Sequence, residues 1–296
     1  MKRLFIINPN SGKKGRAQKL KAVIKKHFGA DDIDIELTRR KGHGKELAVK
    51  ALAKGYEQII VCGGDGTINE AAQALAHTKT ALGVIPLGSG NGLAREIGMP
   101  LDNFDAACNT IAAARAVRCD LGKANGEYFV NLAGMGIEAD IAADFDSHGT
   151  RGKWPYFKLG AQRILNYRAP LVNIDTEAPA GPQNIKMRPL TLVFSNGRQY
   201  GSGFKIAPAA SFNDGLLDMV CIKRQNIAKL LVSMPNFFKQ GIMPIETRDF
   251  YKITKATVNI GGEFNYHIDG EPRRGKDTLQ IEIAPGAIYL IMANLL

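Results

Sequence analysis

The chain has 296 residues, of which 45% are hydrophobic and 32 are glycines, a length that allows two domains with separate cores. Lys and Arg number 39 against 28 Asp and Glu, which gives a formal net charge of +11. This excess favours anionic partners such as nucleotides, nucleic acid or an anionic membrane surface. No run of about 18 apolar residues occurs, which excludes a membrane-spanning helix. The short apolar N-terminus does not fit a signal peptide, and four cysteines without C-x-x-C spacing fit a reducing cytosol, so we expect a cytoplasmic protein.

The first 120 or so residues alternate between strand and helix patterns. Short apolar runs predict strands, and apolar residues at helical spacing predict helices between them. The expected strands are 4–7, 33–37, 58–62 and 82–85, and the expected helices are 16–28, 45–54, 68–76, 93–97 and 104–114. Repeated strand–helix units of this kind predict an α/β domain with a mostly parallel sheet and helices on both faces.

The pattern changes near residue 120, after which strands predominate. The expected strands are 128–132, 171–175, 190–195, 216–222, 252–260, 279–283 and 287–292, with helical stretches around 153–167 and 227–238. Strands in succession predict a second, mainly antiparallel domain, which we interpret as a β-sandwich. We place the domains at residues 1–122 and 123–296, with the last few residues as candidates to return to the first domain.

The turn Gly63-Gly64-Asp65-Gly66-Thr67 follows an apolar run and directly precedes a helix pattern. A strand that feeds a glycine turn at a helix N-terminus is suited to bind phosphate, because free N–H groups and the helix dipole meet there. Asp65 would repel phosphates, so it makes sense as a ligand of a metal ion or of water on that ion. Three similar turns, 8–12, 38–44 and 86–92, also follow predicted strands, and together they indicate a nucleotide site.

Other nucleotide and hydrolase motifs are absent from the sequence. There is no G-x-x-x-x-G-K-[ST], no G-x-G-x-x-G, no G-x-S-x-G and no H-E-x-x-H. These absences argue against a P-loop NTPase, a dinucleotide-binding fingerprint, an α/β-hydrolase and a zinc protease of that type.

The chain resembles the diacylglycerol kinase-like family of soluble lipid kinases, which is related to sphingosine and ceramide kinases. The matching segments occur in family order along nearly the whole chain: residues 8–12, Thr38, 63–70, 86–91, 120–122, 131–136, 213–218 and 269–272. Gly-Gly-Asp-Gly-Thr alone is less specific, because NAD kinases share it and phosphofructokinases carry a close variant. The resemblance implies a first domain like those of NAD kinases and phosphofructokinases.

The resemblance also implies an ATP-dependent kinase that phosphorylates a lipid hydroxyl. The implied nucleotide-binding positions are Asn8, Pro9, Asn10, Ser11, Gly12, Thr38, Gly63, Gly64, Asp65, Gly66, Thr67, Ile68, Asn69, Glu70 and Ser89. The implied catalytic acidic pair is Asp269 and Glu271; either could be the base, and Glu271 is our first choice. From the residues alone, Asp269-Gly270-Glu271 reads as a hairpin turn.

Two Mg²⁺ ions are implied. The resemblance places a structural ion at Asp214, with Ser211 and Leu216 as neighbouring ligands through main-chain carbonyls. A second, catalytic ion would come with ATP, near Asp65 and Asp120.

One departure from the family bears on the substrate. Many bacterial members read Gly-Thr-x-Asn-Asp where this chain reads Gly88-Ser89-Gly90-Asn91-Gly92, which looks more like the sphingosine and ceramide kinase branch. We expect diacylglycerol or a related glycerolipid as substrate. A sphingoid base or ceramide is the first alternative, and a soluble NAD kinase-like activity is the second.

The expected partner is a lipid at an anionic membrane surface, met by peripheral association with the inner face of the membrane. Residues 145–167 contain Trp, Tyr and basic side chains and are a candidate contact with the lipid headgroups, although packing in a core is the commoner role of such aromatics. No nucleic-acid partner is expected, because no aromatic-basic recognition motif is present. A homodimer is left open.

Overall fold

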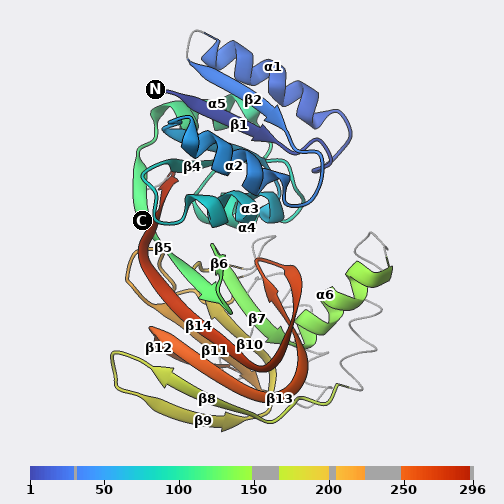
Figure 1. The fold of residues 1–296 in the computed structure, drawn as a ribbon, viewed down its shortest axis with the longest axis vertical. Coiled ribbons are helices and arrows are strands. Elements are labelled where there is room, and N and C mark those ends of the chain that lie inside the picture. The colour runs from blue at the N-terminus through green and yellow to red at the C-terminus, as the bar shows by residue number, and fades with distance from the viewer. Residues whose placement is uncertain (30–31, 149–166, 200–204, 224–247, 294–296) are drawn as a thin grey trace.

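The computed structural model describes residues 1–29, 32–148, 167–199, 205–223 and 248–293. Figure 1 shows an α/β domain at the top and a β domain below it. The expected helices 153–167 and 227–238, and most of the expected headgroup contact at 145–167, lie outside the described residues.

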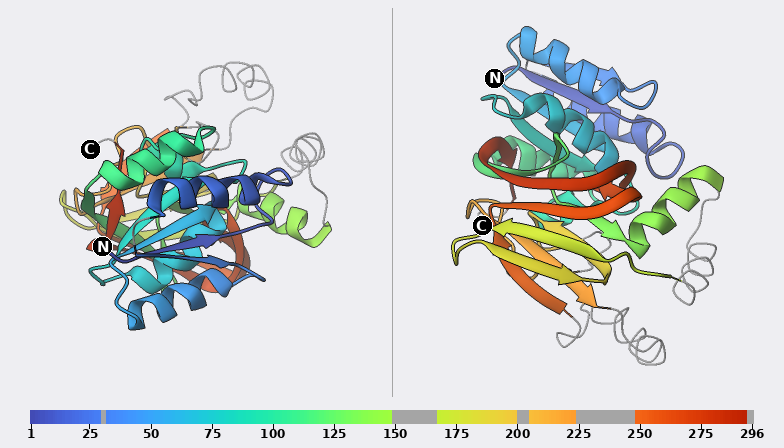
Figure 2. Two further views of the ribbon diagram at one scale, coloured as in Figure 1. Left: turned by 90° about the horizontal axis from the view of Figure 1, so that it is seen from above. Right: turned by 60° about the horizontal axis from the view of Figure 1, so that its bottom comes forward.

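The first domain is a parallel sheet in the order β4-β3-β1-β2. Its strands are β1 (Arg3–Ile7), β2 (Ile33–Leu37), β3 (Gln58–Gly63) and β4 (Ala81–Pro86). Its helices are α1 (Arg16–Phe28), α2 (His43–Ala53), α3 (Asp65–Leu75), α4 (Gly92–Glu96) and α5 (Phe104–Ala113). Helix α1 packs with α5 and α2 packs with α3, and Figure 2 shows these pairs on opposite faces of the sheet. The expected parallel sheet with helices on both faces is confirmed.

The second domain is a β-sandwich with α6 (Ile137–His148) along one side (Figure 1). Its strands are β5 (Ala116–Ala124), β6 (Glu127–Phe129), β7 (Leu132–Gly136), β8 (Val172–Glu177), β9 (Gln183–Met187), β10 (Pro189–Ser195), β11 (Leu217–Lys223), β12 (Arg248–Ile253), β13 (Lys255–Ile268) and β14 (Glu271–Ile291). Buried side chains of β7, β10 and β11 pack against those of β8, β13 and β14, and this apolar layer is the core of the sandwich.

The long strand β14 joins the two domains. It pairs antiparallel with β13 and β5, and near its end Tyr289 and Leu290 pair in parallel with Ala81 and Leu82 of β4. Ile288, Leu290 and Ile291 are consequently buried in the core of the first domain. The strand that begins at Glu271 therefore runs from the edge of the first domain through the sandwich and back.

Several strand expectations in the second domain were wrong. The expected strand 128–132 spans the break between β6 and β7, and the expected strand 252–260 is divided between β12 and β13. The expected strands 279–283 and 287–292 are parts of the single strand β14. Strand β13 continues past residue 260. Gly261 and Gly262, with φ of 76° and 88°, form an irregularity there, and the pairing with β14 resumes at Glu263. Gly286, with φ of 56°, lies in a similar shift in the pairing of β14 with β5.

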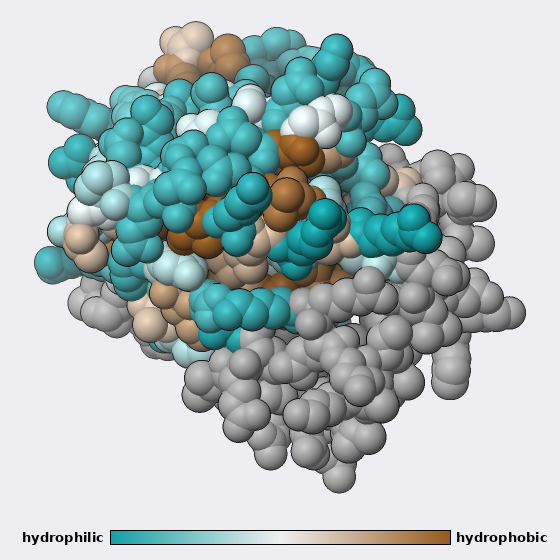
Figure 3. Space-filling view, turned by 90° about the horizontal axis from the view of Figure 1, so that it is seen from below, coloured by the Kyte–Doolittle hydropathy of each residue, from teal (hydrophilic) through white to brown (hydrophobic). Residues whose placement is uncertain are grey.

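The surface of the β-domain end is mainly hydrophilic, with an apolar area between hydrophilic residues (Figure 3). Leu171 and Phe250 are the large apolar side chains of this domain that are most exposed among the described residues, at 43% and 41%. Within the described ranges, every helix is too short or too polar to cross a membrane.

Candidate active site

Two glycine turns meet at the carboxyl ends of β3 and β4. Strand β3 ends at Gly63 and α3 begins at Asp65, while the turn after β4 carries Gly88. A Cβ added to Gly88 would lie 2.8 Å from the Cα of Gly64. The two turns therefore pack backbone against backbone, and the start of α3 is left without side chains that would cover its N–H groups.

A cavity of about 490 Å³ opens at this place. It collects residues from the ends of β1, β2 and β3 and from the start of β14: Asn8, Asn10, Ser11, Thr38, Arg40, Lys41, Gly64, Gly66, Thr67, Asn69, Glu70, Glu271 and Arg273. Nine of the residues predicted to bind nucleotide line it, namely Asn8, Asn10, Ser11, Thr38, Gly64, Gly66, Thr67, Asn69 and Glu70. Pro9, Gly12, Gly63, Asp65, Ile68 and Ser89 do not line this cavity; Ile68 is in the core and Ser89 is exposed.

Hydrogen bonds hold the walls of this cavity together. The Asn8 side-chain amide donates to the Thr67 hydroxyl at 2.9 Å, which fixes the turn after β1 against α3. The Glu70 carboxylate accepts the N–H groups of Gly42 and Gly44 at 2.6 and 2.9 Å. Glu70 therefore satisfies the free donors at the start of α2 and positions the loop that carries Lys41.

The side chain of Asp65 lies behind the glycine turn and contacts the start of the short helix α4. Its Oδ1 accepts the N–H of Leu93 at 3.3 Å, and its Oδ2 lies 3.1 Å from the place of a Cβ on Gly90. Burial raises the pKa of Asp65 above its ordinary value, and N–H groups at the start of α4 act against that shift. The carboxylate thus connects the two glycine turns, and Gly92 is the first residue of the helix it contacts.

Glu271 reaches the turn 63–67, the predicted nucleotide turn, from the second domain. Its Oε1 lies 2.9 Å from the place of a Cβ on Gly66, so that the carboxylate sits directly over this glycine and would have to shift if a side chain stood there. Its Oε2 accepts a hydrogen bond from the Lys41 ammonium at 2.6 Å. The Glu271 side chain is 36% exposed, which leaves its carboxylate accessible from the cavity.

Asp269, two residues earlier, has no acceptor position left for a substrate. Its Oδ1 accepts the N–H groups of Asn131 and Leu132 at 2.9 and 3.0 Å. Its Oδ2 accepts the N–H of Val130 and the Asn69 side-chain amide, both at 2.8 Å. Burial raises the pKa of Asp269, and these four donors act against that shift. The geometry makes Asp269 a residue that positions the hairpin against α3.

Asp120 lies at the domain junction and does not line the cavity. Its Oδ2 accepts the N–H of Gly215 at 2.8 Å, and its Oδ1 accepts the N–H of Gly286 at 2.6 Å. These contacts tie β5 to the loop that contains Ser211, Asp214 and Leu216 and to the irregular part of β14. A catalytic metal near Asp120 stays a prediction.

Three basic residues at the cavity were not among the predicted site residues. Arg40 pairs with Glu46, Lys41 with Glu271, and Arg273 with Glu127. Arg39-Arg40-Lys41 follows β2 directly, and this basic run at a strand end is the signal that could have found two of them. Arg16, another basic residue near the turn 8–12, does not line the cavity. It lies near Asp102 and over the ring of Phe104.

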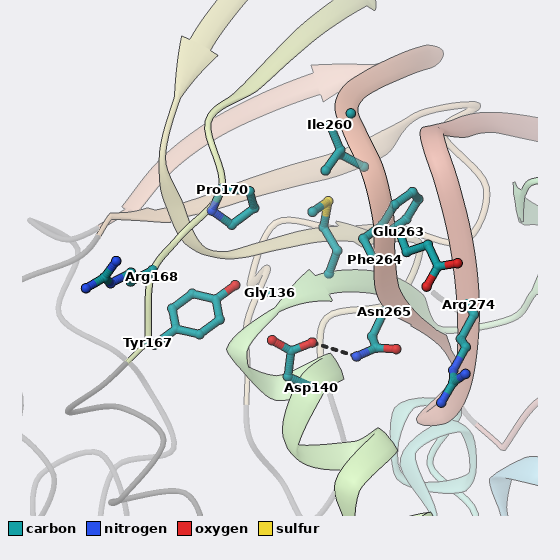
Figure 4. A pocket seen from close by; sticks show the side chains of 12 residues that line it. Gly136, Asp140, Tyr167, Arg168, Pro170, Ile260, Glu263, Phe264, Asn265 and Arg274 are labelled. Atoms are coloured by element: carbon teal, nitrogen blue, oxygen red, sulfur yellow. Dashed lines mark hydrogen bonds between the residues drawn. The ribbon is translucent and has the colours of Figure 1, made fainter.

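A second cavity, of about 500 Å³, lies in the β domain between α6 and the β13–β14 hairpin (Figure 4). In it, the Asn265 side-chain amide donates to Asp140 at 2.8 Å. Asn265 pairs with Arg274 across the hairpin, whereas Glu271 and Arg273 point to the other face because side chains alternate along a strand. The hairpin therefore separates this cavity from the one that contains Glu271.

Family models cover nearly the whole chain. Residues 2–124 match the diacylglycerol kinase catalytic domain, and residues 131–292 match the YegS C-terminal NAD kinase beta sandwich-like domain. A solved structure of a diacylglycerol kinase from Bacillus anthracis superimposes with a TM-score of 0.74 at 24% identity, covering 98% of this chain and 96% of that one, which shows the shared fold.

Curated relatives agree with these models. The diacylglycerol kinase of Bacillus subtilis is 31% identical over 278 residues, which cover 92% of this chain and 90% of that protein. The diacylglycerol kinase of Mycobacterium tuberculosis is 31% identical over 281 residues, or 90% of this chain and 87% of that protein. A protein of Pseudomonas savastanoi named "Probable lipid kinase YegS-like" is 32% identical, with 91% and 87% covered. The chain therefore belongs to the diacylglycerol kinase-like family and is a lipid kinase that uses ATP.

Proposed function

We propose that this kinase transfers the γ-phosphoryl group of ATP to a hydroxyl of diacylglycerol or a related glycerolipid. The observation that carries the proposal is the position of Glu271, whose carboxylate from the second domain lies against Gly66 at the start of α3. A glycine turn suited to phosphate and an accessible carboxylate share one cavity, which is the arrangement that phosphoryl transfer to an alcohol requires. The names of the relatives support diacylglycerol as the acceptor.

The cavity fits the phosphates of a nucleoside triphosphate by its charge. Gly64 and Gly66, in the turn after β3, leave backbone N–H groups open to phosphate oxygens, and Arg40, Lys41 and Arg273 supply positive charge. Mg²⁺ carried with ATP would neutralise phosphate charge, and we propose that Asp65 helps to hold it from behind the glycine turn.

Glu271 is the proposed general base. The lipid hydroxyl oxygen forms a bond to the γ-phosphorus while the bond to the ADP oxygen breaks, and the hydroxyl proton passes to the Glu271 carboxylate. Asp269 cannot take this role in the described geometry, because four donors occupy its two oxygens. It instead holds the hairpin so that Glu271 faces the nucleotide turn.

Lys41 is proposed to move from Glu271 to a phosphate oxygen when ATP binds. Lys41→Met should therefore lower kcat/KM for ATP by about 10- to 100-fold, because a charged hydrogen bond is worth about 1.5–3 kcal/mol. The melting temperature should hardly change, because the ion pair is exposed: the side chain of Lys41 is 70% exposed and that of Glu271 is 36% exposed. Steady-state kinetics with varied ATP measure the effect. Lys45→Met, which removes an exposed charge of α2 outside the cavity, is the matched control, and equal kinetics of the two variants would contradict this role.

The substrate is tested with a panel of acceptors in mixed micelles with ATP and Mg²⁺. Diacylglycerol, another glycerolipid, ceramide, a sphingoid base and NAD are compared at equal concentration by transfer of labelled phosphate. We expect the highest kcat/KM with a glycerolipid. Preference for ceramide or a sphingoid base would show that the acceptor is not a glycerolipid and would agree with the Ser89-Gly90-Asn91 turn. Phosphorylation of NAD alone would contradict the proposal that the acceptor is a lipid.

We also propose that the enzyme meets its acceptor by peripheral association with the anionic inner face of the membrane. The net charge of +11 supports this, because juxtamembrane basic residues each contribute about 1 kcal/mol near an anionic surface. Sedimentation with vesicles of anionic and neutral phospholipids should show binding to the anionic vesicles alone, weakened by salt. Equal binding to both kinds of vesicle would contradict an electrostatic attachment.

A further inference from the structure

The loop before β11 is fastened by a lysine from the neighbouring strand. The Lys252 ammonium of β12 lies 2.8 Å from Asp214 Oδ2, 2.8 Å from Asp218 Oδ2 and 3.3 Å from the Ala209 carbonyl oxygen. The ammonium therefore donates hydrogen bonds to Asp214 and Ala209 and forms an ion pair with Asp218. The same cation thus contacts both ends of the stretch from Ala209 to Asp218.

The lysine is partly withdrawn from water. Its side chain is 35% exposed, and its partners Asp214 and Asp218 are 31% and 5% exposed. The ammonium lies between two carboxylates and compensates the negative charge of the buried Asp218.

A divalent cation at Asp214 does not fit beside this lysine. Asp214 Oδ1 already accepts the N–H of Leu216 at 3.0 Å, and Oδ2 is the oxygen that contacts Lys252. Mg²⁺ bound to Oδ2 at about 2.1 Å would lie within about 5 Å of the ammonium and would be repelled by it.

We propose that the Lys252 ammonium is the resident cation of the loop from Ala209 to Asp218, and that this chain keeps its domain junction without a divalent ion at Asp214. The structural metal implied by the family resemblance is here replaced by a side chain. The loop matters beyond itself, because the N–H of Gly215 donates to Asp120 in β5 and Asp120 also holds Gly286 in β14. A protein-borne cation would make this junction insensitive to the supply of Mg²⁺.

The test compares melting temperatures of the nucleotide-free enzyme in EDTA and in millimolar Mg²⁺. The melting temperature of the native chain should differ by no more than about 1 °C between the two buffers. Lys252→Met should melt about 4–8 °C lower, because removal of the lysine leaves the charge of the buried Asp218 without a counter-charge. In Lys252→Met, Mg²⁺ should restore part of the loss through the freed carboxylates. Lys255→Met, on the next strand along the chain, is the matched control. The ion pair of Lys255 with Glu177 is 3.6 Å long and exposed.

A melting temperature of the native chain that falls in EDTA, recovers with Mg²⁺ and loses this response in Asp214→Asn would overturn the proposal. A response that survives Asp214→Asn belongs to another site and agrees with it. Equal melting of Lys252→Met and Lys255→Met would also overturn it. If Lys252→Met does not fold, the comparison of the native chain with Asp214→Asn still decides.

Discussion

Glu271→Gln should lower kcat by about 10²- to 10⁴-fold, the usual contribution of a positioned general base, while the enzyme stays folded. The amide keeps the size of the carboxylate but cannot accept the hydroxyl proton of the acceptor. The cost in stability should be below about 0.5 kcal/mol, because the lost ion pair with Lys41 is exposed. Initial rates with saturating ATP and a glycerolipid, and a thermal melt of the same preparation, measure the two effects.

Glu263→Gln is the control for removal of charge from the same hairpin. Glu263 is exposed and lies on the cavity beside α6, away from the nucleotide turn. This variant should keep the activity of the native enzyme. A Glu271→Gln enzyme with native kcat would show that another group takes the proton, and the proposed mechanism would then be wrong.

The first domain could be predicted almost element by element because three of its four strands are buried on both faces. All residues of β1, β3 and β4 are buried, so each strand is a continuous apolar run between helical patterns. In the second domain β9 is largely exposed, and β13 and β14 continue through glycines that looked like turns. Strand β9 was therefore missed, and strand β5 and helix α6 were missed as well, although the sandwich itself was predicted.

The candidate site was predictable where backbone geometry requires a residue type and less so where only charge is needed. A Cβ on Gly88 would lie 2.8 Å from the Cα of Gly64, so the close approach of the two turns requires glycine at this position. Arg273 carries no such local signal in a chain with 39 Lys and Arg, and Lys41 is marked only by the basic run 39–41 after β2. The choice between Asp269 and Glu271 also needed the structure, because it depends on which carboxylate is already surrounded by donors.

Asp269→Asn should lower the free energy of unfolding by about 2–4 kcal/mol and lower kcat as well. The amide nitrogen of asparagine would face N–H donors on one side, so that about two of the four hydrogen bonds would be lost and buried donors left unpaired. The backbone is not the cause, because asparagine tolerates the left-handed φ of 48° as well as aspartate does. Urea denaturation and steady-state kinetics measure the two losses.

Asp277→Asn is the matched control, since Asp277 also has a positive φ of 63° in β14 but is exposed and accepts one N–H, that of Gly262 at 2.9 Å. It should cost less than about 1 kcal/mol. Stability and kcat together then separate the two acids. Asp269→Asn should lose kcat and stability together, whereas Glu271→Gln should lose kcat with its stability kept. An Asp269→Asn enzyme that is as stable as the native chain and yet loses as much kcat as Glu271→Gln would instead make Asp269 the base, because a positioning residue cannot remove a proton-transfer step while leaving the fold intact.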